Sequence, residues 1–396
     1  MVLKKDTTTP SAMSSPTTIS ASNEYSPLRA LIIGRAAHSL FPSEPPHMIR
    51  ATMPTLHHPE FRPHHPFPAD IVAKADQELD NFARVMTERF GIKVYRPKEV
   101  DWAKANEGRG GYTGAMPRDG LMVVGRTVVE ACFGWGCRRG EIELAYSGVL
   151  EDIMEGAQKA GESLRVCRAP KIVGGNTLYD GLLDDDKPED GGAKQNGTIP
   201  RGSQNGNQTT HWAINNTRPA FDCADFMRFG TVLIGQLSHV TNPKGVDYLR
   251  AVLPASYTVE LLNTTDDHAM HIDATILPLR HGMLIYCPSR VTEEELRRHE
   301  VFRDWDLRPL PWNPEEEEEE EEKDEGPPRY MCSKWLVLNA MSVDEKTIVV
   351  EERQERFARW LEEEFGMEVV RLPFRHVNSL GGSFHCATVD LVRKEL

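Results

Sequence analysis

The 396-residue sequence contains no run of 18 apolar residues, so it predicts no membrane-spanning helix. It also lacks an excess of basic residues, because 46 Lys and Arg stand against 60 Asp and Glu. Eight consecutive glutamates, Glu315–Glu322, contribute strongly to the net charge of −14, which is −6 without them. An acidic chain without a basic stripe predicts no nucleic-acid partner.

The cysteines lack the patterns of a disulfide framework or a zinc site. There are seven, an odd number, and no two of them form a CxxC pair. The histidines of the His-Pro stretch, His57, His58, His64 and His65, lack helical i, i+4 spacing and favour a proline-stiffened loop over a metal site. These patterns indicate a reducing compartment and a chain without a metal centre.

Residues 1–25 predict a disordered segment, since ten of the sixteen residues from Thr7 to Ser22 are Ser or Thr. The segment lacks the apolar core of a secretory signal. It also lacks the arginines and the amphipathic stripe of a mitochondrial transit peptide. We therefore expect a cytoplasmic protein, with a mitochondrial location as the alternative.

Residues 26–396 predict a single α/β domain built from a repeat. Five strand-rich units follow one another, each with one helix and each closing with an exit strand. The expected helices are Ile71–Phe90, Glu143–Ala160, Val246–Val252, Glu293–Phe302 and Glu352–Phe365. A strand is expected at Leu336–Asn339. Five similar units predict a radial arrangement around an internal site.

Two insertions interrupt the repeat. Gly181–Thr210 is rich in Gly, Asn, Gln and Asp, which is typical of a flexible excursion. Residues from about 312 to 328 contain the glutamate run between prolines and predict a solvated loop.

Polar residues stand where each unit opens its first strand. If the units surround an axis, these openings converge on one central cavity. They are Met116–Asp119, Phe221–Asp225, Met270–Asp273, Cys332–Lys334 and His385–Cys386. Buried carboxylates without a nearby cation are costly unless a cationic ligand neutralises them. A planar guanidinium with five N–H donors suits that set of acceptors.

The stretch Leu380–Asp390 presents a thiol after two glycines, which allow the backbone to approach a ligand. Cys386 can act as a nucleophile in its thiolate form, although a buried, inert cysteine is the alternative. His271 can give and take a proton near neutrality. Asp222 and Asp273 can hold guanidinium nitrogens and orient the central carbon towards sulfur.

Several segments resemble the glycine amidinotransferase family. They are Ala115–Asp119, Phe221–Arg228, Val240–Asn242, Met270–Thr275, Ser333–Trp335 and Asn378–Cys386. The resemblance implies the pentein fold, a five-fold pseudosymmetric α/β propeller, with neither a metal nor an organic cofactor. It also implies Cys386 as nucleophile, His271 as general acid and base, and Asp222 as their electrostatic partner. The substrate-binding residues it implies are Asp119, Asp273, Arg290, Cys332 and Ser333.

The expected reaction moves the amidino group of L-arginine to an amine. Glycine is the expected acceptor, giving guanidinoacetate, the precursor in creatine biosynthesis, and ornithine. The alternatives are an aminocyclitol or secondary-metabolite amine as acceptor, arginine hydrolysis by a related pentein, and an inactive arginine-binding protein. The sequence departs from the family at Cys332, where a second serine is usual, and at His268, near a usual asparagine. The oligomeric state stays open, with a homodimer as one expectation.

Overall fold

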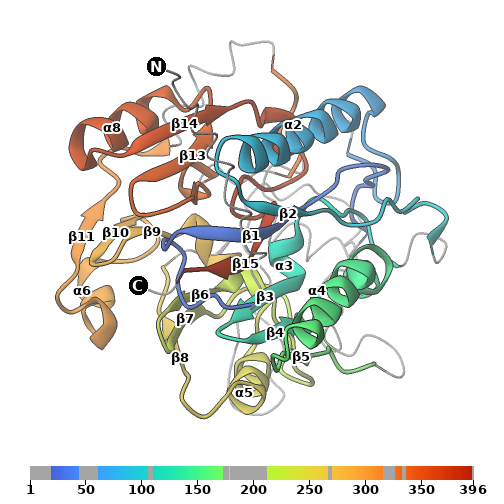
Figure 1. The fold of residues 1–396 in the computed structure, drawn as a ribbon, viewed down its shortest axis with the longest axis horizontal. Helices are drawn as coiled ribbons and strands as arrows, with labels where there is room; N and C mark the ends of the chain where they lie inside the picture. Colours follow the sequence, from blue (N-terminus) through green and yellow to red (C-terminus); the bar gives the residue numbers. More distant parts are fainter. Residues whose placement is uncertain are drawn as a thin grey trace, which may run out of the picture.

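Five three-stranded sheets form the described part of the protein (Figure 1). The structure is a computed structural model that describes residues 19–43, 61–105, 110–172, 178, 212–265, 270–314, 326–331 and 336–394. In every sheet the central strand pairs antiparallel with one neighbour and parallel with the other. This repeated topology confirms the predicted α/β pentein fold of five strand-rich units.

The first sheet joins the two ends of the chain. The C-terminal strand β15 (Thr388–Arg393) pairs antiparallel with β1 (Leu28–Ile33), and β1 pairs parallel with β2 (Lys93–Tyr95). Since β15 directly follows Cys386, the pairing fixes the cysteine loop against the beginning of the fold.

The other four sheets each use three consecutive strands. They are β3–β5 (Leu121–Val124, Thr127–Glu130, Arg165–Cys167), β6–β8 (Phe226–Phe229, Val232–Gln236, Thr258–Leu262), β9–β11 (Ile276–Arg280, Met283–Tyr286, Asp306–Pro309) and β12–β14 (Met341–Ser342, Thr347–Glu351, Glu368–Leu372). Their central strands are almost entirely buried, as parallel pairing covered by helices requires.

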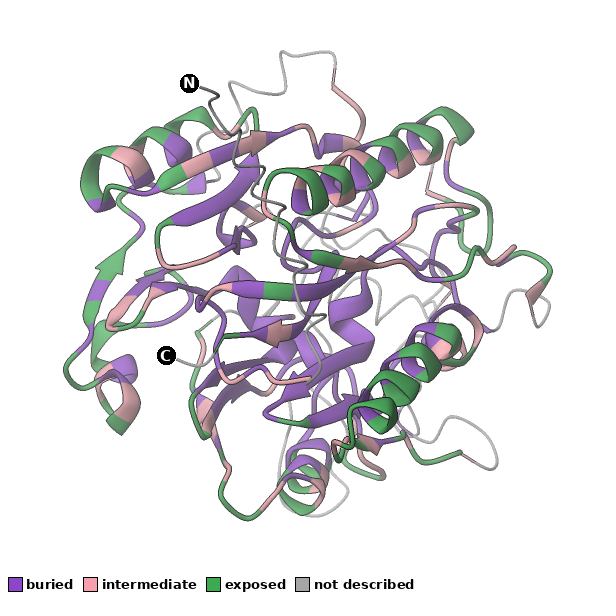
Figure 2. Cartoon of the chain, viewed as in Figure 1, coloured by how far each residue is buried: buried purple, intermediate pink, exposed green. Residues whose placement is uncertain are grey.

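One helix crosses from each central strand to its parallel neighbour. The five are α2 (Ala69–Glu88), α4 (Ser147–Lys159), α5 (Pro243–Val252), α6 (Glu293–Arg297) and α8 (Glu355–Phe365). These helices lie at the periphery of the fold, and each has buried residues on one side and exposed residues on the other (Figures 1 and 2). In α2 the buried stripe includes Ile71, Leu79 and Phe82, as the predicted 3.6-residue period requires.

Three predicted elements differ from the structure. Residues Ile142–Tyr146 form a π-helical turn before α4, and α6 stops at Arg297 before a 3-10 turn at Glu300–Phe302. The Arg297 guanidinium donates to the carbonyls of Phe302, Arg303 and Trp305, which folds the chain back after α6. The predicted strand Leu336–Asn339 is wrong, because Leu336–Leu338 is a 3-10 turn and the strand begins at Met341.

The N-terminal expectation extends too far along the chain. Residues 19–25 are ordered, with bridges from Ser20 to Val392, Ala21 to Gly125 and Asn23 to Phe229. The buried Glu24 carboxylate accepts hydrogen bonds from Arg228. Composition favoured disorder, but these contacts with three different sheets stabilise the segment. Residues 1–18, the insertion at 181–210 and residues 315–325 lie outside the described part.

Short turns precede the first strands of the sheets and meet at the centre of the fold.

Within the described ranges, no helix has both the length and the apolar character that crossing a membrane requires.

Candidate active site

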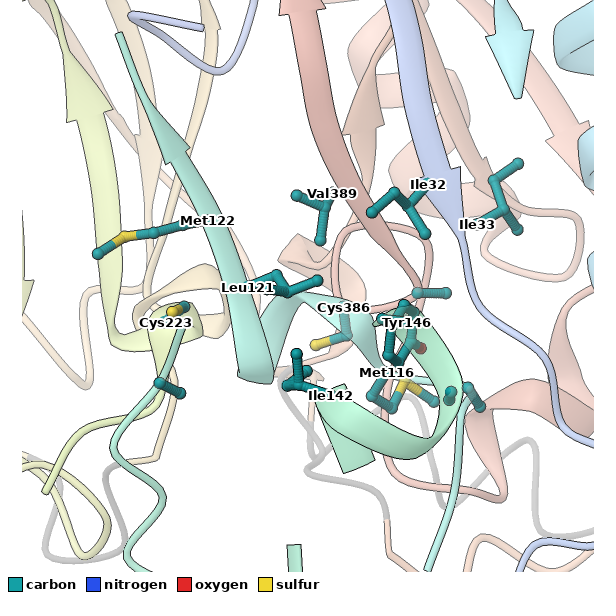
Figure 3. Packing of buried hydrophobic residues seen from close by; sticks show 14 of the residues in the cluster. Ile32, Ile33, Met116, Leu121, Met122, Ile142, Tyr146, Cys223, Cys386 and Val389 are labelled. Atoms are coloured by element: carbon teal, nitrogen blue, oxygen red, sulfur yellow. The ribbon is translucent and has the colours of Figure 1, made fainter. Parts of the chain in front are cut away.

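The predicted site residues come together at these turns. Helix α3 (Pro117–Gly120) precedes β3 and contacts the turn Cys223–Asp225, which contacts the turn Ile272–Ala274. The latter contacts the turn Leu336–Leu338. The side chains gathered here are Asp119, Asp222, His271, Asp273 and Cys386, each at most 6% exposed. Cys386 lies among the packed residues of the central cluster, near Met116 and Leu121 (Figure 3).

The His271 imidazole lies between two carboxylates. Its Nε2 is 3.2 Å from Asp222 Oδ2, and its Nδ1 is 3.6 Å from Asp119 Oδ1. Burial alone would lower the pKa of His271, but these two carboxylates raise it well above its usual value. The imidazole can therefore carry a proton at neutral pH and hand it to a leaving group.

The backbone at His271 is held in an unusual conformation. Its φ is 65° and its ψ is 120°, a region that side-chain-bearing residues seldom occupy. The Asp225 carboxylate accepts the His271 N–H at 2.9 Å and also accepts hydrogen bonds from Gln236, Ser238 and Thr241. Asp225 thus anchors the strained backbone that aims the imidazole.

The Cys386 thiol lies among polar groups. Its Sγ is 3.3 Å from Asp273 Oδ2, and Asn339 Nδ2 donates to the sulfur at 3.1 Å. Burial, and then the negative charge of Asp273, raise the pKa of Cys386 to about 12. A raised pKa favours the neutral thiol over the thiolate at neutral pH.

Only glycine fits at position 382 in the loop before this cysteine. A Cβ there would lie 2.5 Å from Met116 Sδ and 2.7 Å from Cys386 Cβ. Gly381 has a φ of 101°, which favours glycine for conformational reasons. The Gly-Gly pair therefore allows the thiol to pack closely against α3.

Three buried carboxylate oxygens in the site lack a hydrogen-bond partner among the described residues. They are Asp119 Oδ1, Asp222 Oδ1 and Asp273 Oδ1. Unsatisfied acceptors of this kind suit a ligand that brings several N–H donors and a positive charge. One possible metal-ligand atom from each of Asp119, His271 and Cys386 also lies within 4.8 Å of the other two, so in the described part of the chain these three residues form a group that could hold a metal ion.

The sequence did not predict Arg138, the cation that forms ion pairs with the site carboxylates. Arg138 Nη1 is 2.7 Å from Asp119 Oδ2 and 3.7 Å from Asp222 Oδ2, and its guanidinium also pairs with Glu141. It lies over the rings of Phe133 and Tyr112, at 4.7 and 5.2 Å from their centroids. Arg138 follows the first hairpin of its sheet instead of opening a strand, so the pattern of openings could not identify it.

A second buried network of hydrogen bonds and ion pairs holds the Asp273 carboxylate through His385. His385 Nδ1 is 2.8 Å from Asp273 Oδ2, and His385 Nε2 is 3.4 Å from Glu24 Oε2. Glu24 pairs with Arg118 and Arg228, both of which also pair with Asp390. Burial alone would raise the pKa of Asp273, but the hydrogen bond from His385 lowers it below its usual value.

The remaining predicted residues are placed as follows. Arg290 is buried in the turn after β10, where its N–H donates to the Cys287 carbonyl and its own carbonyl accepts the N–H of Thr265. The role of Arg290 in binding the substrate stays a prediction. Cys332 and Ser333 lie outside the described residues.

Known proteins are similar to this chain over nearly its whole length. An L-arginine:L-lysine amidinotransferase of Pseudomonas savastanoi pv. phaseolicola is 33% identical over 381 residues, which cover 94% of this chain and 93% of the relative. The mitochondrial glycine amidinotransferase of Danio rerio is 30% identical over 386 residues, covering 95% and 83% of the two chains. No protein-family model matches the chain.

A solved structure gives the same result. An amidinotransferase of the saxitoxin biosynthetic pathway from Microseira wollei superposes with a TM-score of 0.74 at 26% identity, covering 96% of this chain and 98% of that one. The identities, the coverage and the five-sheet fold agree with one another. The chain belongs to the amidinotransferase family of the pentein superfamily.

Proposed function

We propose that this amidinotransferase takes the amidino group of L-arginine onto Cys386 and passes it to the amine of a second substrate. The observation that carries the proposal is the set of three buried, unsatisfied carboxylate oxygens of Asp119, Asp222 and Asp273 in the cluster that holds the thiol. A guanidinium bound there would satisfy these acceptors and place its central carbon near sulfur.

The first half-reaction begins with a neutral thiol and a protonated His271. The positive guanidinium of arginine favours loss of the thiol proton to the solvent, and the resulting thiolate attacks the guanidinium carbon. The tetrahedral intermediate breaks its bond to the δ-nitrogen of the ornithine portion. His271 supplies the proton that this nitrogen needs to leave as an amine. Cys386 then carries the amidino group as a thioether, and His271 is neutral.

The second half-reaction reverses these roles. An acceptor arrives as an ammonium ion and gives a proton to neutral His271, which makes its amine nucleophilic. The amine attacks the amidino carbon and the Cys386 thiolate leaves. The second proton of the attacking nitrogen returns the thiolate to a neutral thiol as the new guanidinium compound forms. One histidine thus serves both halves, with Asp119 and Asp222 stabilising its protonated form.

The acceptor that we favour is an amino acid with a side-chain amine, lysine being the first candidate. If Arg290 binds the arginine carboxylate as the resemblance implies, the acceptor entering the vacated space can use the same cation. Lysine separates its terminal amine from its carboxylate by nearly the distance found in ornithine, whereas glycine does not. The similarity to an arginine:lysine amidinotransferase and the departures at His268 and Cys332 agree with this choice.

Glycine, expected from the sequence, is the second candidate because the glycine amidinotransferase of Danio rerio is 30% identical to this chain.

A panel of acceptor amines distinguishes these candidates. The protein is incubated with arginine labelled in its guanidino carbon and with glycine, lysine or an aminocyclitol in turn, and products are identified by mass spectrometry. We expect labelled homoarginine with lysine, and parallel double-reciprocal lines that indicate a ping-pong mechanism. Labelled guanidinoacetate alone would replace lysine with glycine, and steady citrulline unaffected by any amine would indicate hydrolysis.

A further inference from the structure

Asn339 makes a contact with the thiol that the sequence did not predict. It follows the turn Leu336–Leu338, so it occupies the fourth opening around the centre, in a segment expected to be a strand. Its side chain is 1% exposed, and its Nδ2 lies 3.1 Å from Cys386 Sγ. Such a contact places a hydrogen-bond donor directly on the sulfur atom.

The orientation of this amide is fixed by its other contacts. Asn339 Oδ1 accepts the backbone N–H groups of Ser383 and Cys386, both at 3.1 Å. Backbone N–H groups can only donate, so the amide oxygen must face them. The opposite end of the amide, its NH₂ group, must therefore face the sulfur.

The same relationship occurs two strand openings earlier in the fold. Asp225, in the turn before β6, accepts the backbone N–H of His271 in the turn before β9. Asn339, after the turn that precedes β12, accepts the N–H of Cys386 in the loop before β15. In each case one polar side chain holds the backbone of the next reactive residue. At Asn339 an amide replaces the carboxylate, and this difference supplies a donor towards the thiol.

We propose that Asn339 is a further catalytic residue of this chain, whose amide donates to the Cys386 sulfur and stabilises the thiolate during attack and departure. This proposal rests on the proposed function, since it assigns a residue to its covalent step. The surrounding carboxylates explain the need for such a donor. Asp273 lies 3.3 Å from the sulfur and repels a negative charge there, whereas Asn339 offers a neutral N–H.

The donor acts at two stages of the reaction. When the S–H bond breaks, negative charge collects on sulfur and the N–H···S hydrogen bond strengthens. Charge then leaves the sulfur as it bonds to the amidino carbon, and it returns when the product departs. Asn339 neither gains nor loses a proton, so the proton balance between the thiol, His271 and the substrates is unchanged.

Asn339→Asp separates the sulfur contact from support of the loop. The carboxylate retains an acceptor for the N–H groups of Ser383 and Cys386, but its other oxygen would face the sulfur and repel the thiolate. Asn339→Ala removes both contacts. Asn378→Ala is the matched control, because Asn378 is also buried and donates its side-chain N–H to the Gly382 carbonyl of the same loop, 2.9 Å away.

The test measures alkylation of Cys386 by iodoacetamide at several pH values without substrate, using mass spectrometry of the peptide that contains it. At a fixed pH below the thiol pKa, we expect both Asn339 variants to alkylate about 10- to 100-fold more slowly than the natural protein. Asn378→Ala should change this rate by less than about threefold, because the Asn378 amide supports the loop through the Gly382 carbonyl. Thermal unfolding establishes that each variant is folded.

A folded Asn339→Asp with an unchanged alkylation rate overturns the proposal, and so does an equal loss in Asn378→Ala. Because alkylation needs neither arginine nor an acceptor, it reports on Asn339 even if the proposed transfer is wrong. Labelled arginine then connects the residue to the reaction. Asn339→Asp should slow formation of the amidino-Cys386 adduct by at least the factor seen in alkylation, and normal adduct formation would contradict a catalytic role.

Discussion

His271 and Asp222 are joined by a 3.2 Å contact between imidazole Nε2 and carboxylate Oδ2, both side chains being buried. Asp119 lies on the opposite nitrogen at 3.6 Å. Together these carboxylates favour the protonated imidazole, which the proposed mechanism needs when ornithine leaves. These two neighbours therefore identify His271 as the residue that holds the proton. The pH dependence of the reaction tests this assignment.

Asp222→Asn should lower the pKa of His271, because it removes one of the negative charges that raise it. His271 would then lose its proton at a lower pH, and the loss of activity should grow as pH rises. We expect ornithine release in a single turnover to fall about 100-fold or more near neutral pH. Rapid-quench measurements across the pH range give the profile. Asp247→Asn, an exposed partner of Arg250, is the control. An unshifted alkaline limb would contradict the role given to Asp222.

Cys386→Ser should abolish covalent labelling by arginine that carries label in its guanidino carbon, because an alcohol is a far weaker nucleophile at neutral pH. In the natural protein, acid quench should leave about one label per chain, located on the Cys386 peptide. Cys223→Ser is a demanding control, since Cys223 is buried next to Asp222 and its thiol donates to the Val129 carbonyl. Label on a cysteine other than Cys386 would reject the assigned nucleophile.

Glu24→Gln should destabilise the protein by about 3 kcal/mol at neutral pH, since Arg118 and Arg228 would lose a buried carboxylate partner. Burial alone would raise the pKa of Glu24, but Arg228 and His385 lower it well below its usual value. The carboxylate therefore contributes stability above the pKa of an unfolded glutamate, and this stability is lost as pH falls from about 5.

Urea denaturation of both proteins between neutral and acidic pH measures the effect. The variant should lose less of its free energy of unfolding on acidification than the natural protein does. Glu88→Gln removes an exposed partner of Arg84 and should change stability by less than about 1 kcal/mol. Equal acid sensitivity in the natural protein and Glu24→Gln would show that Glu24 does not carry this dependence.

The sequence predicted the repeat because each unit contains local signals: helical periodicity, a glycine or proline stop, and polar residues before a β-branched strand. It also predicted that Asp119, Asp222, His271, Asp273 and Cys386 meet, since radial repetition brings equivalent openings together. The side chains that support them depend on contacts that no local pattern encodes. Arg138 follows a hairpin, and Glu24 belongs to a Ser/Thr-rich segment that composition assigns to disorder.

Asn339 shows the same limit within a single turn. The apolar run Leu336–Leu338 favours a strand, but the chain turns there so that the Asn339 side chain can hold the cysteine loop. The turn is stabilised by contacts with the loop of residues 383–386, which lies more than forty positions later in the sequence. Secondary-structure propensity at such a position is overridden by tertiary contacts.

Because the pKa of Cys386 is raised, we expect arginine binding itself to ionise the thiol. Burial and Asp273 keep the thiol neutral, with a pKa of about 12. A guanidinium about 4 Å from sulfur stabilises a thiolate by about 4 kcal/mol at an effective dielectric constant of about 20. This energy lowers the thiol pKa by about 3 and raises the thiolate fraction near neutrality about a thousandfold.

The measurement is made at a pH about 3 below the pKa of the thiol without arginine, where bound arginine ionises about half of the Cys386 thiols. Mixing the protein with arginine there, in a weakly buffered indicator solution, should release protons before ornithine forms. Thiolate ultraviolet absorbance should rise in the same phase, and protons should be taken up again as ornithine leaves and becomes an ammonium ion. Cys386→Ser should show neither signal, because its alcohol stays protonated. A thiolate absorbance already present without arginine, or ornithine formation that precedes any proton release, would mean that the nucleophile is ionised before the substrate binds. The carboxylates around the sulfur would then have a different purpose from the one proposed, since they oppose that ionisation until a cation arrives.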